Sequence, residues 1–457
     1  MRQLTWQSPV TRPLVLVACF LLFALAVGLP GCGDDSDGGG TEGGEKKADV
    51  APRPSGEKSD AAVETLIDQA IARVKAGDSK GAIELLSQVI GNDPNNARAF
   101  AIRADIYAAR KQDANALADF GSAIRIEPET PKWRNARGFF LFTRGKRDAA
   151  LRDLNAAITL DGKYAEALNN RGLVHVGGQE YQLAIKDFDE AIRADAKYAD
   201  AWNNRGFAHF RSDQHAKALA DFNQALACDK KFIMAYNNRA LLRMARKEYR
   251  EAVADCTQAI GLDSDNPRFY QLRREAYRRM GKAKEALADG EMMIWLITYQ
   301  RLSQQIARAP RGADGYILRA RHLAEQGRTG AALADYQRAI AVEPAKAVDA
   351  YIDRARHWIS QKQWQKALED CQSALKSGAT HEAWSLRGEA YKGLQRWDEA
   401  ISDFVKARRF DDVVAATYAA RAEVHKKAGR TAEAEADTKR AVELDPTAFG
   451  SGKPSVP

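Results

Sequence analysis

Cysteine is scarce in this sequence, and the few cysteines form no paired motif. No two of them stand in a CxxC pattern, which excludes the disulfide framework of a small secreted scaffold. We expect the cysteines outside the N-terminal segment to be buried free thiols. The 457 residues include five, namely Cys19, Cys32, Cys228, Cys256 and Cys371.

Recognisable catalytic motifs are also missing. The chain contains no HExxH, GxSxG or GxxxxGK[ST] sequence, no dinucleotide-binding fingerprint and no alternating pattern typical of strands. We therefore expect neither an enzyme nor a bound cofactor. The seven histidines do not change this expectation, because His175, His209 and His425 fall on a packing position of the repeats described below. We predict no metal site.

Long hydrophobic runs are limited to one near the N-terminus. Leu14–Val27 is apolar and uncharged, but its 14 residues are short for a membrane-spanning helix, which needs about 20. Leu29, Pro30, Gly31 and Cys32 follow it, and this sequence resembles a bacterial lipoprotein box. The resemblance implies a signal peptide over residues 1–31, lipid attachment at Cys32 and a lipid-anchored protein of the bacterial cell envelope, on the periplasmic or extracytoplasmic side. An uncleaved anchor and ordinary secretion are the alternatives.

Residues 32–60 contain almost no apolar side chains and are rich in Gly and Asp. Such a segment buries too little surface to offset the entropy of ordering, so we interpret it as a disordered tether. A coil of this length spans on the order of 30 Å. We expect residues 447–457 to be a disordered tail.

The rest of the chain repeats with a period of 34 residues. Copies begin at residues 63, 97, 131, 165, 199, 233 and 267, and after twelve extra residues at 313, 348, 381 and 415. Position 20 of each copy is alanine, position 8 is usually Gly or Ala, and positions 4 and 24 are often aromatic. Small and large residues at these spacings predict two helices that pack closely, and such hairpins must stack to bury their faces.

This pattern resembles the tetratricopeptide repeat family from Val63 to about Pro446. The resemblance implies an all-α solenoid, a right-handed superhelix of about eleven helix-turn-helix repeats. It also implies a concave groove lined mainly by the first helix of each copy. We interpret residues 61–312 as a block of seven repeats with an extended last helix, and residues 313–446 as a block of four.

Position 7 is arginine in ten copies, and position 23 is aspartate in ten. The first copy lacks both, with Gln69 and Leu85 in their places. Paired presence and paired absence predict a contact between the two helices. We expect a ladder of partly buried Arg–Asp pairs that stabilises the fold.

One part of the predicted groove, in copies three to six, combines amides with apolar side chains. Asparagine can meet both the C=O and the N–H of an extended peptide, and apolar neighbours supply burial. The alternative is that these asparagines only cap or solvate their helices. The candidate peptide-binding residues are Asn135, Asn169, Asn170, Asn203, Asn204, Asn237, Asn238, Phe139, Phe142, Phe207, Phe210, Leu241 and Met244.

The favoured function is therefore a membrane-tethered scaffold that binds a polypeptide segment in the groove. The net charge of +8 leaves open a charge-driven binder of anionic lipid or nucleic acid, although nucleic acid is the less favoured partner. A passive spacer that binds nothing is the third possibility.

Overall fold

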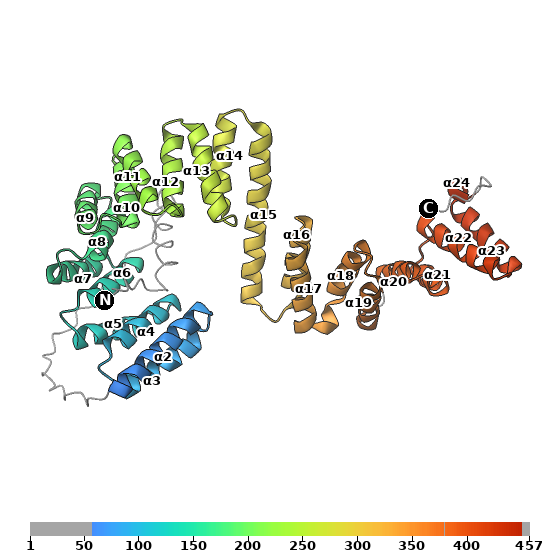
Figure 1. The fold of residues 1–457 in the computed structure, drawn as a ribbon, viewed down its shortest axis with the longest axis horizontal. Helices are drawn as coiled ribbons and strands as arrows, with labels where there is room; N and C mark the ends of the chain where they lie inside the picture. Colours follow the sequence, from blue (N-terminus) through green and yellow to red (C-terminus); the bar gives the residue numbers. More distant parts are fainter. Residues whose placement is uncertain (1–56, 379, 450–457) are drawn as a thin grey trace, which may run out of the picture. The chain divides into compact units, whose positions relative to one another are not determined.

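The computed structural model describes residues 57–378 and 380–449, and these form an all-α structure (Figure 1). The predicted signal peptide, Cys32 and most of the predicted tether lie outside the described residues. Within the described ranges the structure contains helices and turns but no strand, which confirms the predicted fold class.

The helices follow one another in pairs that match the two helices of each predicted copy. In chain order they are α2 Glu57–Lys75, α3 Ser79–Asn92, α4 Ala97–Ala109, α5 Asp113–Ile126, α6 Pro131–Thr143, α7 Arg147–Leu160, α8 Ala165–Gly177, α9 Tyr181–Ala194, α10 Ala199–Arg211, α11 His215–Cys228, α12 Ile233–Ala245, α13 Tyr249–Leu262, α14 Pro267–Arg279, α15 Ala283–Arg308, α16 Ala313–Glu325, α17 Thr329–Val342, the 3-10 turn η1 Pro344–Lys346, α18 Val348–Ser360, α19 Trp364–Ser377, α20 His381–Gly393, α21 Trp397–Lys406, α22 Asp412–Lys427, α23 Thr431–Leu444 and α24 Pro446–Phe449.

Two element boundaries differ by a few residues from those read in the sequence. The first helix begins at Glu57 and so includes the last four residues of the predicted tether. The short helix α24 includes the first three residues of the predicted tail. The carboxylate of Asp445 accepts hydrogen bonds from the backbone N–H groups of Thr447 and Ala448, and these bonds fix that last turn.

Each helix pair packs through small residues, as the sequence predicts. The alanine at position 20 is buried in every copy, from Ala82 to Ala434. At position 8, a side chain on Gly172 would lie 2.6 Å from the ring of Phe188 at position 24. Because that ring occupies the space of a Cβ atom, Phe188 in this position requires glycine at residue 172.

The turn between the two helices has one conformation throughout. Position 15 has a positive φ in all eleven copies, between +55° and +83°. Five copies place glycine there, which adopts this conformation without steric cost, and six use Lys, Gln or Asp. The repeated left-handed residue ends the first helix and starts the second at the same point in every copy.

All ten predicted Arg–Asp pairs are present, so the ladder is confirmed. In each copy the arginine at position 7 bonds the aspartate sixteen residues later, and the aspartate is buried. Hydrogen bonding to Asp119 raises the pKa of Arg103, although burial opposes this effect. The ladder consists of Arg103–Asp119, Arg137–Asp153, Arg171–Asp187, Arg205–Asp221, Arg239–Asp255, Arg273–Asp289, Arg319–Asp335, Arg354–Asp370, Arg387–Asp403 and Arg421–Asp437.

The third guanidinium nitrogen of several ladder arginines reaches the preceding copy. Arg205 Nη1 donates to Asp189 Oδ1 at 2.6 Å, sixteen residues earlier in the chain. The same contact, with a side chain sixteen residues back, joins Arg103 to Ser87, Arg171 to Asn155, Arg239 to Asn223 and Arg319 to Ser303. These arginines therefore fasten the hairpin of one copy to the copy before it.

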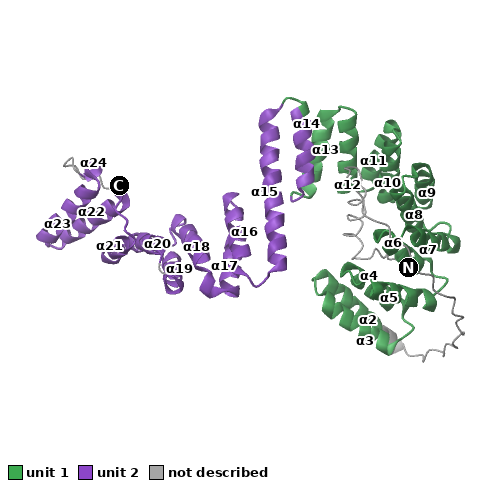
Figure 2. Cartoon of the chain, turned by 180° about the vertical axis from the view of Figure 1, so that it is seen from behind, with its two compact units in different colours: residues 1–264, 279–281 green, residues 265–278, 282–457 purple. Residues whose placement is uncertain are grey.

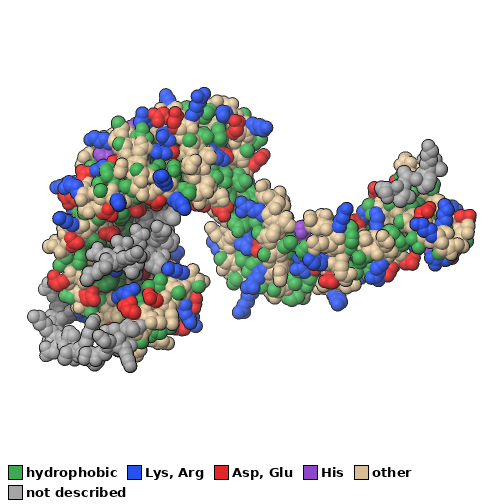
Figure 3. Space-filling model, in the orientation of Figure 1, with side chains coloured by type: hydrophobic (Ala, Val, Ile, Leu, Met, Phe, Trp, Pro, Cys, Tyr) green, Lys and Arg blue, Asp and Glu red, His purple; other side chains and the backbone are tan. Residues whose placement is uncertain are grey.

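The chain forms two compact units (Figure 2). One comprises residues up to Ser264 together with residues 279–281, and it contains α2 to α13. The other comprises residues 265–278 and the residues from Lys282 onward, and it contains α15 to α24 and most of α14. Figure 3 shows Lys, Arg, Asp and Glu side chains interspersed on the visible face. The predicted division after residue 312 stays a prediction.

Removal of one partner of a ladder pair should be costly. We expect Arg205→Leu to lower the free energy of unfolding by about 3 kcal/mol, because Asp221 would remain buried without its cation. Asp221→Leu should cost less, since Arg205 keeps Asp189 as a partner. Denaturant unfolding of both single variants and the double variant measures the coupling. Strictly additive effects of the two substitutions would show that the pair contributes no interaction energy.

Candidate functional site

The predicted amides lie on α6, α8, α10 and α12, the first helices of copies three to six. We call the side of these helices that carries the thirteen candidate residues the first-helix face. Across each boundary between copies, one asparagine donates to another 35 residues earlier. The three bonds are Asn170 Nδ2 to Asn135 Oδ1 at 2.9 Å, Asn204 Nδ2 to Asn169 Oδ1 at 2.9 Å and Asn238 Nδ2 to Asn203 Oδ1 at 3.0 Å.

Further bonds link neighbouring amides within a helix. Asn203 Nδ2 donates to Asn204 Oδ1 at 3.2 Å, and Asn237 Nδ2 donates to Asn238 Oδ1 at 3.4 Å. Asn203, Asn204 and Asn238 thus form one connected chain with Asn169. A network of this kind satisfies buried amides and holds their side chains in fixed orientations.

Burial separates the seven amides into two groups. Five are buried, namely Asn135, Asn169, Asn203, Asn204 and Asn238. Asn170 and Asn237 are only half-buried, so these two are the amides that a ligand can reach most readily. The peptide-binding role assigned to all seven stays a prediction, but the structure gives each of them an amide partner inside the fold.

The apolar candidates are likewise divided. Phe139 is buried in a core cluster with Leu173, Val176 and Phe188, and Phe142 and Phe207 pack at its edge. Five candidates are half-buried, namely Phe142, Phe207, Phe210, Leu241 and Met244. These five are therefore the apolar side chains of the first-helix face that remain partly available to a partner.

A cation lies beside the aromatic residues of this face. The guanidinium carbon of Arg211 is 5.9 Å from the ring centroid of Phe207 and 5.5 Å from that of Tyr181. It therefore contacts aromatic rings from two successive copies. Cation–π contacts of this kind stabilise exposed aromatic side chains by about 0.5–1 kcal/mol.

Histidine at position 11 has a role that the sequence pattern did not reveal. The Nε2 atoms of His175, His209 and His425 lie 3.7 to 3.8 Å from a carboxylate oxygen of the ladder aspartate in their own copy. Arg243 and Trp358 occupy position 11 in two other copies. Each donates a hydrogen bond to the ladder aspartate of its own copy, at 2.6 and 3.0 Å. A second polar contact at position 11 thus supports the ladder in these copies, and the recurrence of a polar or aromatic residue there was the available signal.

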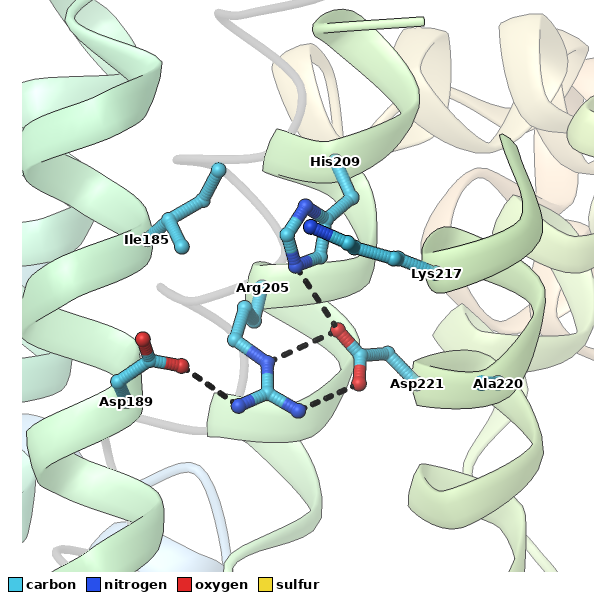
Figure 4. A pocket seen from close by; sticks show the side chains of 7 residues that line it. All are labelled: Ile185, Asp189, Arg205, His209, Lys217, Ala220 and Asp221. Atoms are coloured by element: carbon cyan, nitrogen blue, oxygen red, sulfur yellow. Dashed lines mark hydrogen bonds and ion pairs between the residues drawn. The ribbon is translucent and has the colours of Figure 1, made fainter. Parts of the chain in front are cut away.

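An open pocket of about 410 Å³ lies beside this arrangement in copies four and five (Figure 4). Arg205 lies between Asp189 and Asp221, and His209 and Lys217 lie next to each other above it in this view. Burial lowers the pKa of His209, which favours the neutral form of its ring. Because Arg205 and both carboxylates are already paired, we interpret this pocket as the exposed surface of one Arg–Asp pair of the ladder.

In the second unit, ion pairs join successive first helices where the first unit uses amides. Arg321 of α16 donates to Asp353 of α18 at 2.6 Å and to Asp349 at 3.0 Å. Arg356 of α18 in turn pairs with Asp353 and with Glu382 of α20. The amide and apolar combination thus belongs to the first unit.

Two other kinds of feature are missing from residues 57–378 and 380–449. These residues hold no group of three or more His, Cys, Asp or Glu side chains placed to bind a metal ion. No helix within the same ranges combines the length and the apolar character needed to cross a bilayer.

Comparison with known proteins gives a consistent result at the level of sequence families. Three family models, each described as a tetratricopeptide repeat, match the chain, and together they cover more than half of it. The matched residues are 199–232 for the first model, 67–131, 141–198 and 317–382 for the second, and 235–266 and 415–447 for the third. No curated protein matches the sequence significantly.

Several solved structures are similar to part of the chain. The pilF protein of Pseudomonas aeruginosa is 16% identical with a TM-score of 0.41, over 48% of this chain and 100% of its own. YrrB, described as a TPR protein with an unusual peptide-binding site, is 20% identical with a TM-score of 0.33, over 39% and 91%. MamA of Desulfovibrio magneticus RS-1 is 19% identical with a TM-score of 0.34, over 37% and 97%.

The amide chain should contribute to stability without any ligand. We expect Asn204→Ala to lower the free energy of unfolding by about 1–3 kcal/mol, because it removes the partner of buried Asn169 and Asn203. Asn237→Ala is the matched control, since this half-buried side chain makes one long hydrogen bond and should cost less than about 0.5 kcal/mol. Equal stability of the two variants in urea would contradict a structural role for the network.

Proposed function

Because the chain belongs to the tetratricopeptide repeat family, we propose that it is a scaffold for protein–protein interaction that binds a polypeptide segment on the first-helix face of copies three to six. The single observation that carries this proposal is the set of five half-buried apolar side chains there, Phe142, Phe207, Phe210, Leu241 and Met244. A bound segment would bury their remaining exposed surface, and burial of aromatic and aliphatic anchors is the main source of affinity in such contacts.

The amides support this function in two ways. The hydrogen-bonded chain of buried asparagines fixes the relative positions of α8, α10 and α12, so the apolar side chains between them are held before a ligand arrives. The half-buried amides of Asn170 and Asn237 can then bond the backbone of an extended peptide. Binding therefore relies on preorganised apolar contacts and on two reachable amides.

We further propose that a lipid on Cys32 tethers the scaffold to a membrane of the bacterial cell envelope, on its periplasmic or extracytoplasmic side. The support is the lipoprotein-type sequence Leu29 to Cys32 and the polar segment that follows it. The tether would let the repeats reach a partner on the order of 30 Å from the membrane surface.

The binding site can be located by crosslinking in cells. A photoreactive benzoylphenylalanine in place of Phe207 should give a discrete protein adduct, whereas the same residue in place of Glu423 in α22 should not. Leu241→Asp should abolish the adduct, because it places a charge beside the apolar anchors. Leu318→Asp is the matched control, since Leu318 is 44% exposed on a first helix of the other unit and should leave the adduct unchanged.

Salt separates this function from binding driven by the net positive charge. If apolar side chains anchor the partner, we expect the amount of adduct or complex to stay the same when the ionic strength is raised. Charge-driven binding to nucleic acid would weaken by several orders of magnitude over the same range. An adduct from Glu423 of the same intensity as that from Phe207 would refute the assigned face.

The lipid anchor predicts a clear change in fractionation. The wild-type chain should partition with membranes and incorporate a labelled fatty acid. Cys32→Ser should do neither, while its repeats keep the same thermal unfolding midpoint. Membrane association that is unchanged in Cys32→Ser would show that the N-terminal segment anchors the chain without lipid.

A further inference from the structure

The second helix of a regular copy carries the surface on which the next copy docks. Position 28 is aliphatic and packs against the small residue at position 3 of the following first helix, as Ile192 and Ala201 do within one core cluster. Position 25 accepts the hydrogen bond from the following arginine, as Asp189 does from Arg205. Position 21 packs near position 10 of the following helix, as Leu219 and Leu242 do.

The long helix α15 carries this docking surface twice. Arg319 of α16 donates to Ser303 at 3.1 Å across the usual separation of sixteen residues. A side chain on Gly315 would lie 3.0 Å from Ile306, nine residues earlier, which is the separation between Ala201 and Ile192. Helix α16 therefore docks on Ser303 and Ile306, which lie twelve residues after the regular positions of copy seven.

The regular positions of copy seven are left exposed. They are Leu287 at position 21, Glu291 at position 25 and Ile294 at position 28, and we call them the α15 docking surface. Leu287 is 64% exposed and Ile294 is 62% exposed, whereas Ile124, Ile192 and Leu226 at position 28 of other copies are 8% exposed. Figure 1 shows α16 beside the C-terminal half of α15 only.

The last copy shows which kind of residue stands at the docking positions where the stack of repeats ends. Position 21 there is Glu435, an exposed carboxylate, in place of the usual aliphatic residue. A polar outer face keeps a terminal repeat soluble. Copy seven instead keeps leucine and isoleucine at its exposed positions, so its surface has the composition of an interface and not that of an end.

We propose that the α15 docking surface receives a helix of a partner protein that carries the first-helix pattern of this chain. The pattern is a small residue, an arginine four residues later and an apolar residue three residues after that, as in Ala235, Arg239 and Leu242 of α12. Lying antiparallel to α15, such a helix brings its small residue to Ile294, its arginine to Glu291 and its apolar residue to Leu287. The site is separate from the first-helix face and does not depend on the proposed function.

The first repeat of a second copy is a poorer match. Helix α2 has Gln69 at position 7, so it lacks the arginine that would pair with Glu291. No side chain among its residues 62–75 is one of the strongly exposed large hydrophobic residues. The composition of the surface therefore favours a different protein as the source of the helix.

The test uses the full chain and a labelled peptide with the sequence of Ile233–Ala245, stapled on the side opposite its pattern residues to hold it helical. We expect saturable binding by fluorescence anisotropy, weakened at least about tenfold by Ile294→Asp. Glu291→Arg should also weaken binding, and a peptide with Arg239→Glu should restore it. A peptide of scrambled sequence should not bind.

Thermal unfolding shows whether the substitutions act only on the surface. Ile294→Asp should leave the midpoint unchanged, whereas Ile192→Asp, at the same repeat position but buried, should lower it by several degrees. Equal binding of the peptide to wild type and to Ile294→Asp would overturn the proposal. So would a wild-type dimer in light scattering that Leu287→Asp converts to a monomer, since the occupant would then be a second copy.

Discussion

The ion pair of the partly buried guanidinium at position 7 is the interaction on which the rest of the structure depends. Two nitrogens of the guanidinium bond the aspartate of its own hairpin, and in at least six copies the third bonds the second helix of the copy before it. A planar group with fixed donor directions can serve two helices only if they keep one geometry. The ladder therefore explains why a separation of sixteen residues recurs on both sides of the arginine. It separates the arginine from the aspartate that follows it and from its partner in the preceding copy, from Arg103 in copy two to Arg319 in copy eight.

This rigidity sets the character of the first-helix face. Because successive first helices are held at one spacing, Asn204 can reach Asn169, and Asn238 can reach Asn203, across each boundary. Most of the amides are consequently committed to the fold, which leaves the proposed recognition to the half-buried apolar residues and the two outer amides. A surface fixed in this way loses little conformational entropy when a ligand binds, which favours affinity from a small number of anchors.

The sequence alone was sufficient for the fold and for the ladder, but not for the details of the face. The joint absence of arginine and aspartate in copy one revealed their contact, because both partners lie in the same hairpin. The Asn–Asn bonds join residues 35 apart in different hairpins. The sequence alone does not distinguish such a bonded asparagine from one that only contacts solvent. Phe139 and Phe207 share a repeat position, yet one is buried and the other half-buried.

The extended helix shows how a small change in length creates a new surface. An extension by eleven residues, close to three turns, would have moved α16 along the same face of α15. Twelve residues advance the docking position by about 18 Å and rotate it by about a third of a turn. Helix α16 therefore packs on Ser303 and Ile306 while Leu287 and Ile294 face another direction. The same rotation turns the α15 docking surface away from the face of α15 on which α16 packs.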